Sequence, residues 1–593
     1  MPRLAIAQFR PRKAAYRENL ERFGSLLRDM AAGDVPDLLI LPETAFTGYF
    51  VEGGVRELAV SAEQLFADLT DQHARSGAPP LDVIVGFYEQ WNTRLHNSAL
   101  AASLGGEDAG IRHVHRKIFL PTYGVFDEER FVEPGRSVQA FDTGWGRAAV
   151  IVCEDAWHSL VPAMAALDGA EVVIILCASP ARGIQPTEEA DGRPASTVRW
   201  ERTAQAIAQE HGVYVVVAHL VGFEGGKAFP GGSVVVNPAG VVVLKAPIFD
   251  DALAVTSIDL AEISRARADE PLLSDLETHL PHLLDALIAR RETGRLPGPP
   301  ETAGTWSPRS GRMAPPPLPR GGADPLAIDP ELTGRWLVEF LKDEVTRRRG
   351  FTKVVLGLSG GVDSALVAYL AAQAFGPDNV VAVRMPYRSS SRESLSHAQL
   401  VIDALGIQER TIDISAGVDG IAAALDGPPP ARLGNIMARM RMITLFDFSA
   451  AIGGIPLGTG NKTERLFGYF TWHADDSPPV NPIGDLFKTQ VWALARHLGV
   501  PSAIVDKAPT ADLVAGQTDE GDFGISYPKA DRILHWLLSG YAVPAIQGLG
   551  FTESEIALVK KRLDSTHWKR KLPTVAMLSP TAIGEFYLRP VDY

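Results

Sequence analysis

Short runs of apolar residues alternate with amphipathic stretches along the first 260 residues of the chain. Runs rich in Val, Ile and Leu are typical of strands buried inside a sheet, and the stretches between them are long enough for helices. This alternation predicts an α/β fold. The predicted strands cover residues 4–9, 37–43, 82–89, 148–155, 170–179, 213–220, 233–238 and 240–246.

The pattern changes after residue 265. Leucines recur at helical spacing over residues 266–293, which predicts a helix there. Residues 294–325 are rich in Pro and Gly and show no periodicity, as expected of a mostly irregular connector. A helix start is then predicted at Asp329, in Asp-Pro-Glu. We therefore expect one domain at 1–265, a linker at 266–325 and a second domain at 326–593.

The sequence KVVLGLSGGVDSALVAYL, residues 353–370, predicts a strand, a Gly-Gly turn and a helix beginning near Ala365. Such a turn presents unpaired N–H groups and the positive end of the helix dipole, which suit an anion such as pyrophosphate. Asp363 would repel phosphate unless a cation lay between them. It is therefore a candidate Mg²⁺ ligand.

The loop SGGVDS lacks the Gly-Lys-Ser/Thr of a Walker A loop. It resembles the loop of the ATP pyrophosphatases, which cleave ATP between the α and β phosphates and adenylate an oxygen. The resemblance implies ATP as co-substrate and a Rossmann-like parallel α/β sheet. A Gly-rich turn that binds nothing is the alternative. The implied ATP-binding residues of the loop are Gly357, Leu358, Ser359, Gly360, Gly361, Val362, Asp363 and Ser364.

Three segments of the first half carry side chains suited to amide hydrolysis. Glu43 and Cys153 end predicted strands, and Lys117 lies in a short extended segment. Strand ends of an α/β sheet can converge on one cleft. Cys can supply a nucleophile, Glu a general base and Lys a positive charge for an oxyanion. Taken singly, each is more often a core or surface residue than a catalytic one, and Cys177 is interpreted as a core residue.

The segments LPETAFTGY, RKIFLPTYGVFDEERF and VIVCEDAW resemble the nitrilase, or carbon–nitrogen hydrolase, family and keep its order. The resemblance implies an α-β-β-α sandwich. It also implies that Glu43 is the base, Lys117 the oxyanion stabiliser and Cys153 the nucleophile. Glu128, in FDEER, matches a second, supporting Glu of that family.

These motifs are most similar to the glutaminase domains of glutamine-dependent NAD synthetases. The similarity implies that Tyr123 and Ser179 hold glutamine. Members of that family usually carry a Lys a few residues beyond the Ser-Pro, whereas this chain reads SPARGIQP. Arg182 is the cation nearby, and it is the third residue that we assign to glutamine binding.

Motifs in the second half distinguish among ATP pyrophosphatases. GTGNKTERLFGYFT, NPIGDLFKTQV, PTADLVAGQTDE and a terminal Lys-Arg resemble NAD synthetases, and asparagine, GMP and argininosuccinate synthetases do not share them. The resemblance implies Mg²⁺ on Asp363 and Glu464. Where the family usually reads GYFTKYGD this chain reads GYFTWHAD, so Trp472 replaces a Lys. Further implied contacts are Thr459, Lys488 and Thr510 to ATP, and Asn435, Arg439, Glu464, Asp475 and Lys569 to deamido-NAD.

Composition limits the partners and the location. The net charge of −14 argues against nucleic acid as the main partner. Two cysteines in 593 residues leave no disulfide framework and favour a reducing compartment. No apolar run is long enough to span a bilayer, and the chain begins without a signal-peptide pattern. We expect a cytoplasmic protein without a membrane partner, and the resemblance implies a homo-oligomer built on a synthetase-domain dimer.

Together, the resemblances imply ATP-dependent amidation of deamido-NAD to NAD with ammonia released from glutamine. The other products would be AMP, pyrophosphate and glutamate. One alternative is a ligase that adenylates a different acid. The other is a nucleotide-binding regulatory protein without activity, against which the intact Glu43, Lys117 and Cys153 set and the intact SGGVDS loop both argue.

Overall fold

The computed structural model describes residues 1–33, 35–51, 54–186, 192–292, 324–510, 518–571, 576 and 578. The chain divides into two compact units, the first formed mainly by residues before 293 and the second mainly by residues from 324 onward. The described residues 184–186 and 192 group with the second unit. Most of the predicted connector, at 294–323, lies outside the described residues, as do residues 511–517 of the PTADLVAGQTDE motif.

The described part of the first unit contains two six-stranded sheets, ordered β14-β1-β2-β3-β4-β5 and β13-β12-β9-β8-β7-β6. The parallel pairs β1/β2, β2/β3, β7/β8 and β8/β9 lie at the centres of the sheets, where buried Val, Ile and Leu side chains suit them. A third, two-stranded sheet pairs β10 (Val221–Glu224) with β11 (Lys227–Pro230). The strands of the larger sheets are β1 (Arg3–Gln8), β2 (Leu38–Ile40), β3 (Leu81–Trp91), β4 (Arg94–Leu104), β5 (Gly110–Arg116), β6 (Ala140–Asp142), β7 (Arg147–Val152), β8 (Val172–Cys177), β9 (Tyr214–His219), β12 (Val234–Val236), β13 (Val242–Lys245) and β14 (Ala252–Ser257).

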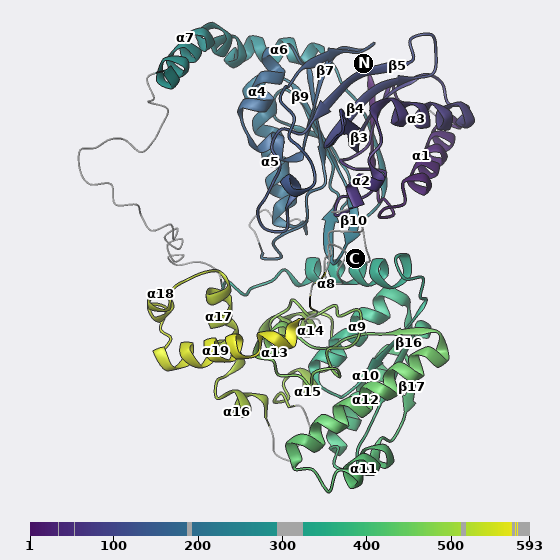
Figure 1. Ribbon diagram of the computed structural model, residues 1–593, viewed down its shortest axis with the longest axis vertical. Helices are drawn as coiled ribbons and strands as arrows, with labels where there is room; N and C mark the ends of the chain where they lie inside the picture. Colours follow the sequence, from purple (N-terminus) through teal and green to yellow (C-terminus); the bar gives the residue numbers. More distant parts are fainter. Residues whose placement is uncertain are drawn as a thin grey trace, which may run out of the picture. The chain divides into compact units, whose positions relative to one another are not determined.

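Helices cover the outer faces of both sheets, so the predicted α-β-β-α sandwich is confirmed. Helices α1 (Tyr16–Ala31) and α3 (Ala62–Ser76) flank the first sheet, and α4 (Leu160–Leu167) and α5 (Ala195–His211) flank the second (Figure 1). Each helix turns an apolar side to its sheet, as α1 does with Leu20, Phe23, Leu27 and Met30.

The helix predicted over residues 266–293 forms as two helices. They are α6 (Ala261–Asp269) and α7 (Leu272–Glu292). Glu270 is extended between them, because the residue before a proline is disfavoured in the helical region. Leu283, Leu284, Leu287 and Ile288 of α7 are exposed.

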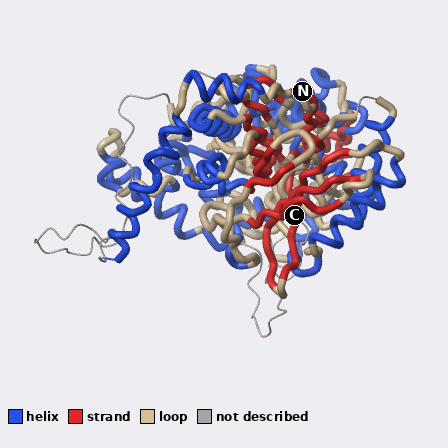
Figure 2. The backbone as a smooth tube through the Cα atoms, turned by 90° about the horizontal axis from the view of Figure 1, so that it is seen from above, coloured by secondary structure: helices blue, strands red, loops and turns tan. Residues whose placement is uncertain are grey.

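The second unit is built on a parallel sheet of four strands within the described residues, ordered β17-β16-β15-β18. This confirms the predicted parallel α/β sheet. Figure 2 shows the whole backbone from above by secondary structure, with helices on both sides of the strands. The strands are β15 (Lys353–Gly357), β16 (Val380–Arg384), β17 (Gln408–Thr411) and β18 (Gly454–Pro456).

Alternate residues of β15 face opposite layers of helices. Val354 and Leu356 belong to the core formed with α8 (Pro330–Leu341) and α9 (Val362–Phe375). Val355 meets Leu445 of α12 (Pro430–Ile452) on the other face. Asp329 caps α8 by accepting a hydrogen bond from the N–H of Leu332, which confirms the predicted helix start.

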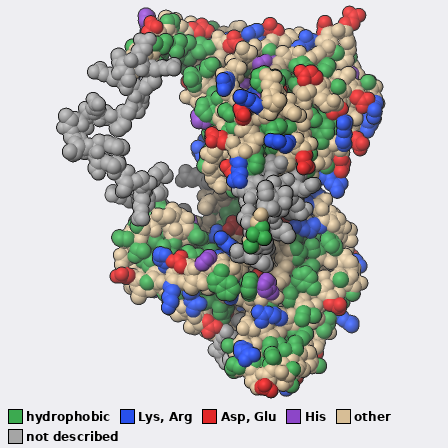
Figure 3. Space-filling model, in the orientation of Figure 1, with side chains coloured by type: hydrophobic (Ala, Val, Ile, Leu, Met, Phe, Trp, Pro, Cys, Tyr) green, Lys and Arg blue, Asp and Glu red, His purple; other side chains and the backbone are tan. Residues whose placement is uncertain are grey.

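The remaining helices complete the two units. In the described part of the chain, no helix combines the length and apolar character needed to cross a lipid bilayer. Acidic and basic side chains are interspersed on the face shown in Figure 3. These helices are α2 (Val55–Leu58), α10 (Arg392–Leu405), α11 (Ser415–Ala424), α13 (Lys462–Phe467), α14 (Lys488–His497), α15 (Ser502–Val505), α16 (Asp519–Phe523), α17 (Tyr527–Leu538), α18 (Val543–Gln547) and α19 (Glu553–Ser565).

Candidate active sites

Glu43 lies in a turn just beyond β2, where the backbone of the first sheet is crowded. A Cβ atom at Gly86, on the neighbouring strand β3, would lie 2.5 Å from the Cα of Glu43. Only glycine allows this approach. Thr44, the next residue, has φ +51°, a left-handed conformation that few non-glycine residues adopt. The strand and its neighbour therefore fix the position of the Glu43 carboxylate.

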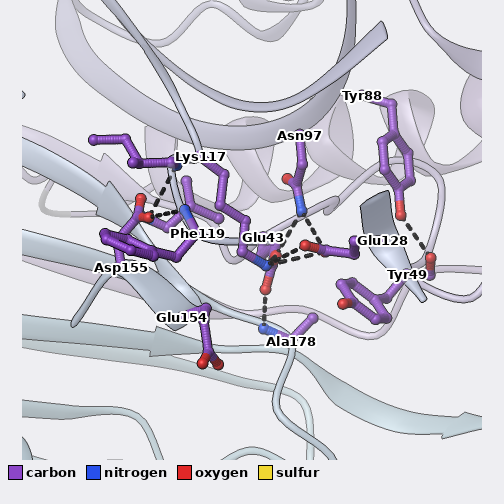
Figure 4. A network of polar contacts seen from close by, with 12 residues as sticks. Glu43, Tyr49, Tyr88, Asn97, Lys117, Phe119, Glu128, Glu154, Asp155 and Ala178 are labelled. Atoms are coloured by element: carbon purple, nitrogen blue, oxygen red, sulfur yellow. Dashed lines mark hydrogen bonds and ion pairs between the residues drawn. The ribbon is translucent and has the colours of Figure 1, made fainter. Parts of the chain in front are cut away.

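The Glu43 carboxylate is fully buried and has a partner on each oxygen (Figure 4). Its Oε1 accepts hydrogen bonds from Lys117 Nζ at 2.9 Å and from Asn97 Nδ2 at 2.7 Å. Its Oε2 accepts one from the N–H of Ala178 at 2.6 Å. These partners hold the carboxylate in one orientation, with Ala178 following the last residue of β8.

Glu128 completes the polar cluster on the other side of Lys117. Its Oε1 lies 3.0 Å from Lys117 Nζ and also accepts a hydrogen bond from Asn97 Nδ2 at 3.0 Å. Burial raises the pKa of Glu128, and the charge of Lys117 opposes this rise. Burial alone would lower the pKa of Lys117, but the charges of Glu128 and Glu43 outweigh it and raise this pKa well above its usual value. Lys117 is therefore a permanent buried cation.

Cys153 directly follows β7 and begins a short 3₁₀ helix, Cys153–Trp157. Its φ of +44° is another left-handed conformation at a non-glycine residue. Asp155 in this helix accepts hydrogen bonds from His115 Nε2 and from the N–H groups of Ile118 and Phe119, each at 2.9 Å. Asp155 therefore ties the turn after the cysteine to the segment that carries Lys117.

The Cys153 thiol is nearly inaccessible, with 7% of the residue exposed. A hydrogen bond to Cys177, then burial and the charge of Glu43, raise the pKa of Cys153 well above its usual value. The thiol is thus protonated in the resting site and needs a base to become a nucleophile. Glu43, whose charge acts on Cys153, can serve as this base. The structure brings Glu43, Lys117, Cys153 and Glu128 into one cluster.

The residues predicted to bind glutamine come from loops around Cys153. Tyr123 donates a hydrogen bond from its hydroxyl to Glu154 Oε2 at 2.8 Å, and it is 56% exposed. Burial of its hydroxyl and this hydrogen bond raise the pKa of Tyr123 to about 12. A Cβ at Gly124 would lie 2.7 Å from Nη2 of Arg182, so this guanidinium is next to the Tyr123 loop. Ser179 is half-buried, two residues beyond β8.

The SGGVDS loop of the second unit joins β15 to α9 and borders a cavity of about 330 Å³. Gly360 has φ +80°, and a Cβ there would lie 2.1 Å from the carbonyl oxygen of Ser394. Helix α9 begins at Val362, earlier than the predicted Ala365. The hydroxyls of Ser359 and Ser364 lie 3.1 Å apart. The predicted ATP-binding residues that line the cavity are Gly357, Leu358, Ser359, Gly361, Val362, Asp363, Ser364, Thr459, Lys488 and Thr510.

Asp363 and Glu464 both face the buried ammonium of Lys488. Lys488 donates a hydrogen bond to Asp363 Oδ2, and its Nζ lies 3.8 Å from Glu464 Oε1. Asn461 donates from Nδ2 to Asp363 Oδ1 at 3.0 Å. Burial and the charge of Asp363 raise the pKa of Glu464 to about 8, although Lys488 opposes this rise. The two carboxylates are thus close enough to share a cation.

The residues predicted to bind deamido-NAD are arranged around the segment 468–475. Asp475 lines the cavity and accepts a hydrogen bond from the N–H of Thr471 at 3.0 Å. Asn435 accepts one from the Thr471 hydroxyl at 3.0 Å. Arg439 donates from Nη2 to the carbonyl of Trp472 at 3.1 Å, and Lys569 donates to the carbonyls of Gly468 and Phe470. Among these residues Asp475 and Glu464 line the cavity, and Asn435, Arg439 and Lys569 do not.

Several residues of both sites were not singled out from the sequence. Asn97 links Glu43 to Glu128, although it lies inside the strand β4 and belongs to no motif. Arg441 lines the cavity, whereas the residues predicted to be functional on this helix were Asn435 and Arg439. Arg441 lies three residues after Ala438 and four residues before Leu445, and both of these line the cavity. This helical spacing places Arg441 on the same side of α12, and it is the signal that could have identified the residue.

Comparisons with known proteins match the two units of the chain to two different families. The NAD synthase family matches residues 334–573, and the carbon–nitrogen hydrolase family matches residues 3–268. An NH(3)-dependent NAD(+) synthetase from Chlorobaculum parvum is 46% identical over 260 residues, which are 44% of this chain and 94% of that protein. A protein of the same name from Trichlorobacter lovleyi is 46% identical over 269 residues, 45% of this chain and 98% of that protein.

One solved structure resembles the chain over almost its whole length. It is a glutamine-dependent NAD+ synthetase from Acinetobacter baumannii in complex with ADP, with a TM-score of 0.66. It is 23% identical, and the match covers 97% of this chain and 95% of that chain. At this identity the likeness establishes the fold alone.

The fold and the two sites define a nitrilase-type hydrolase unit joined to an ATP-pyrophosphatase-type ligase unit. The chain belongs to the NAD synthase family, and it carries a carbon–nitrogen hydrolase domain in addition.

Proposed function

We propose that this protein is a glutamine-hydrolysing NAD synthetase. Its first unit releases ammonia from glutamine, and its second unit uses that ammonia to convert deamido-NAD to NAD at the expense of ATP. The observation that carries the proposal is the buried ion pair of Lys117 and Glu43 beside Cys153, in a chain whose other unit belongs to the NAD synthase family.

In the first site, Glu43 accepts the proton of the Cys153 thiol, and the sulfur attacks the carbonyl carbon of the glutamine side-chain amide. The ammonium of Lys117 stabilises the negative charge that develops on the amide oxygen. Ammonia then leaves with a proton returned by Glu43, and a thioester of Cys153 remains. Water, activated by the same carboxylate, hydrolyses the thioester to glutamate.

Glu128 and Asn97 act as positioning residues in this proposal. Both contact the Lys117–Glu43 pair and hold its two side chains in place. For the substrate itself we propose Tyr123, Ser179 and Arg182. The guanidinium of Arg182 next to the Tyr123 loop is a suitable partner for the α-carboxylate of glutamine, in place of the lysine of related chains.

In the second site, we propose that the nicotinate carboxylate of deamido-NAD attacks the α-phosphate of ATP, and that ammonia then displaces AMP. The loop from Ser359 to Ser364 provides N–H and hydroxyl donors at the start of α9, where phosphate oxygens can bind. Lys488 offers a fixed positive charge at the same cavity. Asn435, Arg439, Glu464, Asp475 and Lys569 are proposed to bind the dinucleotide.

The residues of the second site fit a magnesium ion. Mg²⁺ in phosphate-transfer sites is held by one or two carboxylates together with substrate phosphates. Asp363 and Glu464 face the same ammonium, and the charge of Asp363 already raises the pKa of Glu464. A magnesium ion held by these two carboxylates and ATP would offset the charge of the departing pyrophosphate. In the described residues, no group of three or more His, Cys, Asp or Glu side chains is arranged to hold a metal alone.

Three further expectations from the sequence remain proposals. They are domain boundaries at 1–265 and 326–593 with a linker at 266–325, a homo-oligomer built on a dimer of the second unit, and a cytoplasmic location. Ammonia is mostly protonated in water at neutral pH and is then not nucleophilic. A chain that carries both units is consistent with direct use of the ammonia it releases.

An assay of the complete chain tests the proposal. The protein is supplied with ATP, Mg²⁺ and deamido-NAD, and with either glutamine or ammonium, while NAD and AMP are measured. We expect NAD and AMP in equal amounts with either nitrogen source. Turnover of another carboxylic acid but not of deamido-NAD would favour a different amide-forming ligase, and the absence of AMP with every acid would favour a regulatory protein.

A further inference from the structure

The chain contains two cysteines among 593 residues, and they lie beside each other in the fold. Cys153 directly follows β7, and Cys177 is the last residue of β8. These strands are parallel neighbours whose register pairs Val152 with Leu176, and each cysteine is the residue that directly follows this pair. Neighbouring strands are separated by about 4.7–4.9 Å, and the Cα atoms of a disulfide are usually about 4.4–6.8 Å apart.

Both cysteines are free and belong to the same buried apolar cluster. The interaction with Cys177 is also the largest cause of the raised pKa of Cys153. Cys177 is completely buried, while Cys153 keeps 7% of its surface accessible. A buried residue touches roughly 6–12 others. Two cysteines placed at random in a chain of this length would therefore be in contact about one or two times in a hundred.

We propose that Cys153 and Cys177 form a reversible thiol-oxidation site, in which hydrogen peroxide oxidises Cys153 and Cys177 resolves the product as a disulfide. The Cys153–Cys177 disulfide would block the nucleophile of the proposed glutaminase and protect the sulfur of Cys153 from irreversible oxidation. The effect on activity rests on the proposed function. Formation of the disulfide does not.

The chemistry needs one peroxide and both thiols. The sulfur of Cys153 attacks one peroxide oxygen after losing its proton, the O–O bond breaks, and water leaves, which yields a sulfenic acid at Cys153. The sulfur of Cys177 then attacks the sulfur of Cys153. An S–S bond forms, the S–O bond breaks, and a second water leaves with the proton of Cys177. The two thiols supply the two electrons that reduce the peroxide.

The surroundings of the pair decide which thiol reacts first and which follows. Cys153 is the more accessible thiol, and Glu43, whose charge acts on it, can take its proton. Cys177 lies within the apolar core between the sheets and has no direct access to solvent. Cys177 is therefore the partner that the sulfenic acid meets first.

The second unit contains no cysteine. Oxidation is therefore expected to remove glutamine-dependent synthesis and to leave ammonium-dependent synthesis unchanged. Glutamine bound at Cys153 would shield the thiol, so oxidation is expected to slow when glutamine is present.

The test treats the complete chain and its Cys177→Ala variant with hydrogen peroxide. Intact mass, free thiols and glutamine hydrolysis are measured before and after reduction with dithiothreitol. For the parent chain we expect a mass loss of about 2 Da, loss of both free thiols, and a fall in hydrolysis of about tenfold or more that dithiothreitol reverses. For Cys177→Ala we expect comparable hydrolysis before treatment, and afterwards a gain of about 32 Da that dithiothreitol does not reverse.

Cys153→Ala is the matched control, because it removes the thiol that reacts first. In this variant Cys177 is expected to stay reduced under the same treatment. A parent chain that gains oxygen at Cys153 without forming the disulfide, or that resists peroxide altogether, would overturn the proposal. Because mass and thiol content are measured apart from activity, a disulfide in a chain without glutaminase activity would overturn only the proposed function.

Discussion

Nζ of Lys117 lies 2.9 Å from Oε1 of Glu43, and neither side chain is accessible to solvent. The ammonium also contacts Glu128, so one buried cation faces two carboxyl groups. Burying such charges is costly unless each keeps its partners. We therefore interpret the cluster as an arrangement maintained for catalysis, in which Lys117 serves the developing oxyanion and Glu43 the proton of Cys153.

Lys117→Met should abolish glutamine hydrolysis and also destabilise the first unit. Removing the ammonium leaves Glu43 and Glu128 buried without their cation, a loss of about 3–5 kcal/mol for a broken buried pair. Chemical denaturation followed by circular dichroism measures the loss. The double variant Glu43→Gln with Lys117→Met should recover part of this stability without recovering activity. A single variant as stable as the parent would contradict the role of the ion pair.

Asp363→Asn should abolish NAD synthesis with both nitrogen donors, because the proposed magnesium ion loses a charged ligand and Lys488 loses its ion-pair partner. We expect a fall in kcat of about a hundredfold or more. Asp485→Asn is the matched control, since that carboxylate is 96% exposed and pairs with Lys462. Near-normal NAD formation by Asp363→Asn would remove this residue from the ATP site.

Trp472 stands where the resemblance to NAD synthetases leads us to expect a lysine, and its ring lies edge-on to Trp568 with centroids 5.2 Å apart. An indole can contact a nucleotide ring but cannot supply a positive charge. Trp472→Lys should therefore change KM for deamido-NAD more than it changes kcat. Steady-state kinetics at saturating ATP and ammonium separate the two constants. A change in kcat of about a hundredfold, roughly 2.7 kcal/mol, would assign a catalytic role to this position.

His219, the last residue of β9, should make the first unit sensitive to acid. Burial lowers the pKa of His219 to about 4, and neither ring nitrogen has a hydrogen-bond partner among the described residues. The unfolded chain therefore binds more protons than the folded chain below about pH 6.5. The free energy of unfolding is therefore unaffected by His219 above that pH. It falls as the pH is lowered toward 4, by about 3 kcal/mol in total. His219→Phe, compared with the parent from pH 7 to pH 4, should show a correspondingly smaller loss, and identical profiles would refute this explanation.

Much of the fold could be predicted from the sequence because its central strands are continuous apolar runs. The strands β7, β8 and β9 were predicted for this reason, and all are buried. The strands β4 and β14 were not, because Ala, Asn and Ser in β4 and the half-exposed alternation of β14 lack that signal. Their positions depend on pairing with neighbours that are distant in sequence.

The candidate sites show the same division. Glu43, Lys117, Cys153 and the SGGVDS loop belong to motifs whose residues can be recognised in order along the chain. Asn97 and Arg441 could not be found in this way, because their roles follow from which helix or strand face is turned toward a site. The proximity of Cys177 to Cys153 follows from the register of two strands, and the sequence suggested only a core residue.

The first site should supply ammonia to a second site that can also work without the first, and the Cys153→Ala variant tests this relation most directly. Alanine cannot form a thioester with glutamine, so glutamine-dependent NAD synthesis should fall to background. Synthesis from high concentrations of ammonium should continue at a rate close to that of the parent, because the second site needs only ammonia. The loss of one sulfur atom should cost the fold only about 1 kcal/mol, so the variant is expected to remain folded. Cooperative unfolding of the variant, measured in parallel, checks this. Glutamine-dependent synthesis that persists in a folded Cys153→Ala variant, or ammonium-dependent synthesis that disappears from it, would contradict the account.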